Sequence, residues 1–261
     1  MRKPQGLEFP ALRIVHGPSG PVDIAVCIAD IREIAFADIL NLLSKTELDR
    51  SFRHACDLQA EQTAKARGVL RLMLAQCTGE HPESFEIAEG GGRAPRLLSN
   101  PWQLHFNISH SHHHVVVAIG RTLLGVDIER IRANCEWEAI AAICFHPHEN
   151  EHLRRAGEEA RLDAFFEIWT RKEAYLKAKG TGMTEDLSAF SVVAPDEPVS
   201  PDDPVPILQF WSIQEFNAPC GYKAALASDR PHPAVGYCDL QLLFAAPYEP
   251  PAAAARAGAL I

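Results

Sequence analysis

Two short segments carry carboxylates and an amine at spacings that suit chemistry on phosphates. Asp127 and Glu129 lie two residues apart in Leu-Leu-Gly-Val-Asp-Ile-Glu, so on a strand both side chains leave the same face. Glu173 and Lys177 lie four residues apart, so on a helix they share one face. Carboxylate oxygens are the ligands of hard divalent cations, and a neighbouring lysine suits a phosphate.

Each segment also has an ordinary structural interpretation. Two acids at the end of a strand are often solvated, although Val126 and Ile128 indicate that the opposite face is buried. A Glu and a Lys four residues apart stabilise a surface helix by only a few tenths of a kcal/mol. Trp169 and its apolar neighbours make this helix hydrophobic, which favours a position near the interior for the acid and the amine.

Further polar segments could bind an anion. Ser109-His110-Ser111 ends a predicted strand and offers hydroxyls and an imidazole, whereas residues 112–114 fit a polar loop between two strands. Residues 90–96, Gly-Gly-Gly-Arg-Ala-Pro-Arg, match neither a P-loop nor a dinucleotide fingerprint, but their arginines suit a bidentate phosphate contact or a solvated turn equally. No G-x-S-x-G elbow is present, which argues against a serine hydrolase of that type.

Composition narrows the class of protein. The 261 residues, 47% hydrophobic and 23% charged, are typical of a globular chain with a substantial core. A net charge of −9 without a Lys/Arg run argues against nucleic-acid binding. Seven dispersed cysteines without a C-x-x-C pair indicate reduced thiols, and no apolar run has the length of a signal peptide or a membrane span. We therefore expect a cytoplasmic protein without membrane contact.

Hydrophobic periodicity and turn residues define the expected elements. A capping box at Ser44 and Glu47 begins one helix, and Gly180 follows the last residues of another. Strands are expected at residues 22–29, 85–88, 103–109, 115–119, 123–129, 190–194, 208–216, 222–228 and 235–240, and helices at 31–43, from 44, 58–77, 136–144, 147–155 and 158–179.

This order of elements predicts an α+β (α/β) fold of two similar halves packed as a pseudo-dimer, each with a small sheet and a long helix. Residues 1–120 form the N-terminal half, residues 121–240 the C-terminal half, and residues 241–261 a tail rich in Pro and Ala. Glu47 to Arg71 and Glu149 to Glu173 both span 24 residues, a weak echo of an internal duplication. Only the second half supplies the acids, so a duplication would leave one site between the halves.

Together these segments resemble the 4′-phosphopantetheinyl transferases, specifically the long, pseudo-dimeric type that activates surfactin synthetase. The likeness rests on G-x-D-x-E at residues 125–129, W-x-x-K-E-x-x-x-K at residues 169–177, Phe-Asn-Ile-Ser-His-Ser at residues 106–111, and Phe145-x-x-x-Glu149. It covers about residues 45 to 195 and leaves the tail outside.

The resemblance implies a holo-acyl-carrier-protein synthase type of reaction. The 4′-phosphopantetheine group of coenzyme A would pass to a serine of an acyl, peptidyl or aryl carrier protein, with release of 3′,5′-ADP. Asp127, Glu129 and Glu173 match the family's magnesium ligands, and Mn²⁺ also suits oxygen ligands. Lys177 matches a lysine near the pyrophosphate, and Glu173 is also the candidate base for the serine proton.

The resemblance also assigns coenzyme A contacts, mostly in the N-terminal half. Ser109 and His110 match residues at the phosphoadenosine end. The family's Gly-Lys-Pro contact is altered here, so either Arg93 or Arg96 would replace its lysine. The family's early basic residue on the first-half helix corresponds to one of two arginines, Arg67 and Arg53. Such an enzyme would act as a monomer on a carrier protein, without nucleic acid or membrane.

Two other functions fit parts of the pattern. A metal-dependent nuclease or phosphodiesterase also uses acids and a lysine, but the restriction-type motif places its lysine two residues after the acid on a strand, whereas Lys177 follows Glu173 by four on a helix. A non-catalytic module that binds coenzyme A or a carrier protein would keep the same residues for structure alone.

Overall fold

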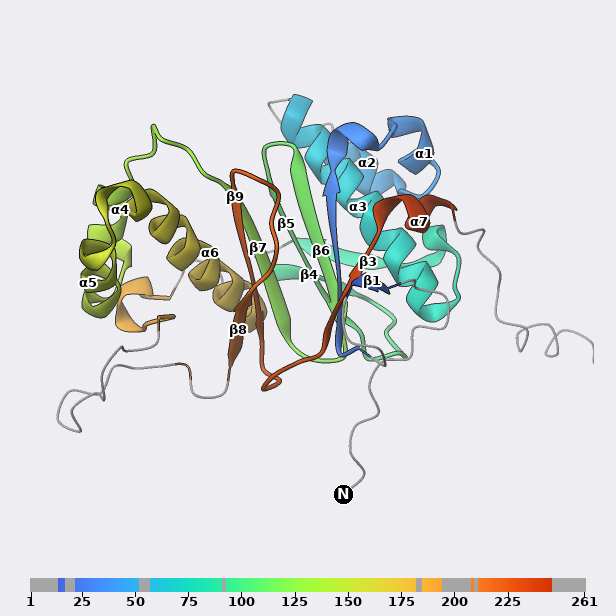
Figure 1. Cartoon of the computed structure of the whole chain (residues 1–261). Coiled ribbons are helices and arrows are strands. Elements are labelled where there is room, and N and C mark those ends of the chain that lie inside the picture. The colour runs from blue at the N-terminus through green and yellow to red at the C-terminus, as the bar shows by residue number, and fades with distance from the viewer. Residues whose placement is uncertain are drawn as a thin grey trace, which may run out of the picture.

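The computed structural model describes residues 14–16, 22–51, 57–90, 93–181, 185–193, 208 and 211–245. Figure 1 shows the strands of two sheets in the middle of the molecule, with one group of helices outside each sheet. This mixed content of helices and sheets confirms the α+β prediction. Among the described residues, no helix combines the length and the apolar composition that crossing a membrane requires.

The elements alternate along the chain. The strands are β1 (Ile14–His16), β2 (Ile24–Asp30), β3 (Ile87–Gly90), β4 (Arg93–Leu97), β5 (His105–Ser111), β6 (His114–Gly120), β7 (Leu124–Arg130), β8 (Ser212–Glu215), β9 (Tyr222–Ser228) and β10 (Val235–Cys238). The α-helices are α1 (Phe36–Leu40), α2 (Lys45–Ser51), α3 (Asp57–Thr78), α4 (Trp137–Cys144), α5 (Pro147–Arg155), α6 (Arg161–Lys179) and α7 (Leu240–Ala245).

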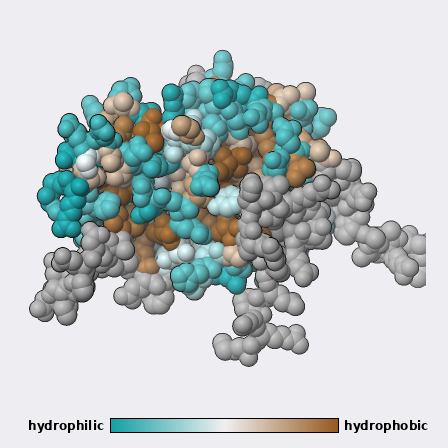
Figure 2. Space-filling view, viewed as in Figure 1, coloured by the Kyte–Doolittle hydropathy of each residue, from teal (hydrophilic) through white to brown (hydrophobic). Residues whose placement is uncertain are grey.

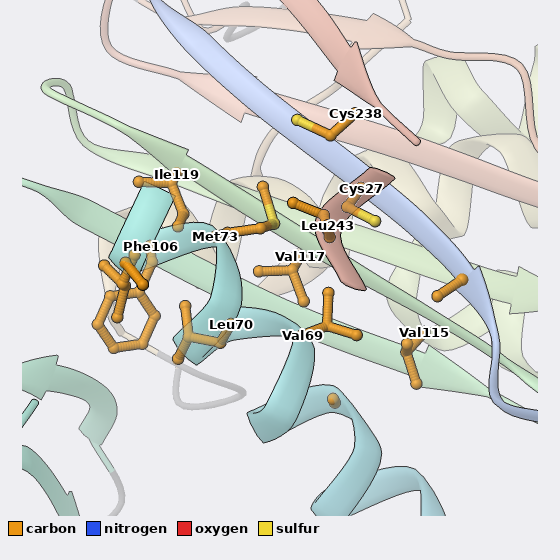
Figure 3. Packing of buried hydrophobic residues seen from close by; sticks show 14 of the residues in the cluster. Cys27, Val69, Leu70, Met73, Phe106, Val115, Val117, Ile119, Cys238 and Leu243 are labelled. Atoms are coloured by element: carbon orange, nitrogen blue, oxygen red, sulfur yellow. The ribbon is translucent and has the colours of Figure 1, made fainter. Parts of the chain in front are cut away.

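The larger sheet has the strand order β1-β10-β2-β6-β5, and α3 packs on one of its faces. The sequence of β6 is a continuous apolar run because both of its faces are buried. Val117 lies in the cluster that contains α3, whereas Val116 lies in the cluster shared with the other sheet. Figure 3 shows Leu70 and Met73 of α3 packed beside Val117 over the strands.

The smaller sheet has the order β7-β9-β8, and α6 lies along its outer face. β7 pairs with β9 over its whole length, with Asp127 opposite Ala225. Val126 and Ile128 point into the cluster between the sheets, so the alternate residues of β7 face α6. Gly180 caps the C-terminus of α6 with a φ of 72°, which glycine adopts easily.

The two sheets share one apolar cluster and also approach each other along their edge strands β5 and β7. Elsewhere between them, a cavity of about 420 Å³ is lined mainly by apolar residues, including Val26, Phe216 and Tyr237. Figure 2 shows hydrophobic residues grouped in the middle of the viewed face, with hydrophilic residues gathered over α5. The polar side chains of the candidate site lie at the β5–β7 edge instead.

Two features agree with the predicted internal duplication. The strand order β2-β6-β5 in the first half has the same connectivity as β7-β9-β8 in the second. In the first half, the buried Arg71 of α3 pairs with Glu47 of α2 at 2.8 Å. In the second, the buried Lys172 of α6 pairs with Glu149 of α5, also at 2.8 Å. The structural counterpart of Arg71 is therefore Lys172, one residue before the Glu173 that the sequence spacing indicated.

Most expected elements are present, with some differences. The capping box is confirmed, since the Ser44 N–H donates to Glu47 Oε2 and the Glu47 N–H donates to Ser44 Oγ. The helix predicted at residues 31–43 is wrong in extent, because a 3₁₀ turn at Ile31–Glu33 precedes the short α1. The predicted strand at 190–194 is wrong for the described residues 190–193, which form only one bridge at Ser191.

The C-terminal elements return to the first half. β10 pairs in parallel with β2, and α7 buries Leu243 in the cluster around α3. α7 thus contains the first residues of the segment predicted to be a tail, and residues from 246 onward lie outside the described part. The division into halves at residue 120 stays a prediction. In the structure, β10 and α7 follow residue 120 in the chain but pack with elements that precede it.

Candidate active site

The acids of β7 and the reactive side chains of α6 are held together by a close approach of strand and helix. A Cβ built on Gly125 would lie 2.2 Å from the carbonyl oxygen of Ala174 and 2.3 Å from the amide nitrogen of Ala178. Only a residue without a side chain allows the α6 backbone to come this near to β7. Because those contacts lie within one turn of Lys177, this approach brings its amine to the strand.

Three polar groups meet at the centre of the site. Lys177 Nζ donates to Asp127 Oδ1 at 2.6 Å and to Ser109 Oγ at 2.8 Å. Ser109 Oγ in turn donates to Asp127 Oδ1 at 2.8 Å. The Asp127 side chain is only 4% exposed, and its other oxygen, Oδ2, is buried without a hydrogen-bond partner among the described residues. A buried carboxylate oxygen without a donor is unfavourable unless a ligand or an ion completes it.

The two remaining acids carry negative charge in a partly buried place. Burial raises the pKa of the Glu129 carboxyl, the charge of Asp127 raises it further, and a hydrogen bond from Ser111 opposes both effects. Burial likewise raises the pKa of Glu173, with Asp127 adding to the rise and Lys177 opposing it. Within the described part of the chain, neither acid forms an ion pair. The acids therefore repel one another, and a cation would relieve that repulsion.

Asp127, Glu129 and Glu173 fit a hard divalent cation because they supply carboxylate oxygens and negative charge. Oδ2 of Asp127 also has no hydrogen-bond partner among the described residues, so it is available to an ion. In their present positions, no three His, Cys, Asp or Glu side chains of the described residues form a ready metal-binding group. Lys177 holds one oxygen of Asp127 instead. Asp127, Glu129 and Glu173 are the residues that would hold such an ion, because they supply the carboxylate oxygens at this junction.

Two adjoining cavities collect the predicted anion contacts. The first, of about 240 Å³, is lined by Arg67 and His110 and also by Arg50. The second, of about 330 Å³, is lined by Arg96 and Lys177. Both cavities share Pro95 and Asn107, so they are neighbours along β4 and β5.

Two of the predicted contacts cannot be placed in these cavities. Arg53 lies outside the described residues. Arg93 belongs to β4, but its side chain also lies outside the described part. One candidate of each predicted pair therefore lines a cavity: Arg67 lines the first and Arg96 the second.

A buried ion pair, to which the sequence analysis assigned no function, orients the helix that carries Glu173. Lys172 and Glu149 are both 0% exposed, and Lys172 Nζ also donates to the carbonyl oxygens of Leu187 and Phe190 at 2.6 and 2.7 Å. Glu149 in turn accepts from the His146 and Val192 N–H groups. The signal for this network in the sequence was Phe145-x-x-x-Glu149, whose acid begins a helix.

The comparisons with known proteins agree with one another. A family model described as the 4′-phosphopantetheinyl transferase superfamily matches residues 123–219. The 4′-phosphopantetheinyl transferase HetI of Nostoc sp. is 30% identical over 191 residues, which cover 72% of this chain and 78% of HetI. A 4′-phosphopantetheinyl transferase of Bacillus subtilis is 31% identical over 201 residues, 75% of this chain and 83% of that protein.

A shorter match includes another enzyme from the same species. The 4′-phosphopantetheinyl transferase Sfp of Bacillus subtilis strain 168 is 33% identical over 132 residues, 49% of this chain and 56% of Sfp. The segment that the family model matches contains both β7 and α6, the two elements that carry the acids and Lys177.

Proposed function

Because the chain belongs to the 4′-phosphopantetheinyl transferase family, we propose that it transfers the 4′-phosphopantetheine group of coenzyme A to a serine of a carrier protein, with Mg²⁺ and with release of 3′,5′-ADP. The observation that carries this proposal is the junction of β5, β7 and α6. There Lys177 forms an ion pair with Asp127, and Glu173 interacts electrostatically with Asp127 and Glu129. Two neighbouring cavities next to this junction have basic residues in their linings.

The basic residues would bind the charged parts of coenzyme A. The phosphoadenosine end suits the cavity lined by Arg50, Arg67 and His110, because guanidinium groups hold phosphate oxygens by paired hydrogen bonds. Lys177 lines the neighbouring cavity and sits at the acids, so its ammonium group is placed to offset charge on the pyrophosphate as the bond to the pantetheine phosphate breaks.

Asp127, Glu129 and Glu173 would hold the metal ion. When bound, Mg²⁺ would neutralise phosphate oxygens and fix their orientation for in-line attack. Glu173 would have a second task, since the raised pKa of its carboxyl makes it a better acceptor for the proton of the carrier serine. Phosphoryl transfer needs positioning and charge compensation more than covalent help, and these side chains supply both.

The test is a transfer assay with purified protein, Mg²⁺, coenzyme A and a panel of apo carrier proteins, read by intact mass. We expect a gain of one phosphopantetheine on the carrier and equimolar 3′,5′-ADP. Asp127→Ala and Glu173→Ala should abolish transfer, whereas His113→Ala, a change in the β5–β6 hairpin, should have little effect. Wild-type activity of Asp127→Ala would refute the assignment of the acid.

The same assay separates the enzyme from a binding module. Coenzyme A that binds without any mass gain across the panel would contradict the proposed transfer and favour a module that only binds. Chelation with EDTA should stop the reaction and added Mg²⁺ should restore it, because neither Glu129 nor Glu173 has an ion-pair partner within the described part of the chain and the acids repel one another without a cation.

A further inference from the structure

β5 and β7 lie side by side at the border of the two halves without forming a common sheet. Each is the edge strand of its own sheet, and no backbone hydrogen bond joins them among the described residues. Three side chains of β5 form hydrogen bonds to β7 instead. Asn107, Ser109 and Ser111 occupy alternate positions, so they share one face of the strand.

Each of these side chains reaches a different point of β7. Asn107 Oδ1 accepts from the Val126 N–H at 3.1 Å, and Ser109 Oγ donates to Asp127 Oδ1 at 2.8 Å. Ser111 Oγ donates to Glu129 Oε2 at 2.8 Å and accepts from the Arg130 N–H at 3.0 Å. These contacts follow β7 from one end of the acid pair to the other.

We propose that Ser109 and Ser111 are positioning residues, whose hydroxyls fix the Asp127 and Glu129 carboxylates for the metal ion. This inference rests on the proposed function, in which these acids are metal ligands. It assigns Ser109 a task other than the coenzyme A contact expected from the sequence. It also makes the first half of the chain responsible for orienting the acids of the second.

The direction of both hydrogen bonds follows from their partners. A backbone N–H and a lysine ammonium only donate, and a hydroxyl has one proton. Because Ser111 Oγ accepts from Arg130, its own proton is directed to Glu129. Because Ser109 Oγ accepts from Lys177, its proton is directed to Asp127. Neither hydroxyl can rotate its proton elsewhere without giving up its acid.

Each serine occupies one oxygen of its acid and leaves the other for a ligand. Ser109 and Lys177 both contact Oδ1 of Asp127, and Oδ2 is the buried atom without a partner. Groups that orient metal ligands in this way are typically worth about 10- to 100-fold in metal affinity. The serines are also well placed to stay fixed, since Ser109 is 6% exposed and belongs to the regular β5–β6 pairing.

The experiment measures metal binding directly on the full chain, without a carrier protein. Mn²⁺ is titrated in the presence of saturating coenzyme A, and free Mn²⁺ is followed by electron paramagnetic resonance, with coenzyme A alone as the blank. We expect Ser111→Ala and Ser109→Ala to weaken Mn²⁺ binding by about tenfold or more, whereas Ser111→Thr, which keeps the hydroxyl, should bind nearly as wild type. Ser84→Ala, in a 3₁₀ turn outside the site, is the matched control.

Two further measurements separate positioning from other roles. Asn107→Ala removes the contact to the backbone of β7 but leaves the contacts to both acids in place. It should therefore lower the melting temperature and leave the Mn²⁺ affinity close to that of the wild type. The dissociation constant of coenzyme A, measured without metal, should be unchanged in Ser111→Ala. Circular dichroism of each variant checks that the fold is intact.

Wild-type Mn²⁺ affinity in a folded Ser111→Ala variant would overturn the proposal for Ser111. A Ser109→Ala variant that loses coenzyme A affinity but keeps its Mn²⁺ affinity would overturn it for Ser109 and favour the ligand contact. Failure of the proposed function would be a distinct result. The wild-type chain would then transfer no phosphopantetheine, although Ser109→Ala and Ser111→Ala still weaken Mn²⁺ binding.

Discussion

Replacing Gly125 by alanine tests how the site is assembled. The added Cβ would lie 2.2 Å from the Ala174 oxygen, 2.3 Å from the Ala178 nitrogen and 2.9 Å from the Lys177 carbonyl carbon. All three are backbone atoms, so no side-chain rotation relieves the contact. An ordinary contact begins near 3.4 Å, and α6 must therefore retreat from β7 by about 1 Å.

The size of the effect follows from this retreat. Overpacking of this kind costs about 1–3 kcal/mol, which for a chain of this length lowers the melting temperature by about 2–12 °C. The same movement separates Lys177 Nζ from Asp127 Oδ1, now 2.6 Å apart. Because a displacement of about 1 Å in a catalytic group costs on the order of 100-fold in rate, we expect activity to fall much more than stability.

Thermal unfolding and the carrier mass assay measure the two effects separately. Gly157→Ala is the matched control, since a Cβ at Gly157 meets nothing within 4 Å. That variant should keep the activity of the wild type and lose no stability. If Gly125→Ala instead has wild-type melting temperature and turnover, the strand and helix do not need their close approach, and the reasoning from backbone distances is refuted.

Three further results are expected. Lys172→Met leaves the 0% exposed Glu149 without its cation. It should lower the free energy of unfolding, measured in urea, by about 3–5 kcal/mol. Adding Glu149→Leu to this variant should recover part of the loss, and no recovery would contradict the pairing. Burial and neighbouring acids raise the pKa of Glu173 above 4.5, so ionising it costs stability as pH rises past that value. Metal-free Glu173→Gln in EDTA should therefore melt above the wild type at neutral pH, with the gap closing toward pH 4.5; a constant gap would exclude this titration as its cause. Added Mg²⁺ should raise the melting temperature of the wild type in the presence of coenzyme A but not that of Asp127→Asn, because a ligand that binds only the folded state stabilises it.

Local patterns predicted the parts of the fold that depend on neighbours in sequence. The capping box at Ser44, the long α3 and the strand β7 were predicted to within one or two residues, since caps and alternation act over a few positions. The helix expected at residues 31–43 was predicted wrongly because apolar spacing alone cannot show that Asp30 caps a 3₁₀ turn there. The pairing of β10 with β2 joins residues about 210 apart, and no local pattern encodes it.

The candidate site divides in the same way. The sequence by itself determined which residue types are present for phosphate chemistry, which acids share a face of β7 and which acid and amine share a face of α6, because strand and helix periodicity require it. Only the tertiary structure decided that Gly125 lets the helix reach the strand, that Arg50 joins Arg67 and His110 around one cavity, and that Ser111 contacts Glu129. These relations join segments far apart in the chain, and their distances are set by packing between the two halves, which spacing along a sequence does not contain.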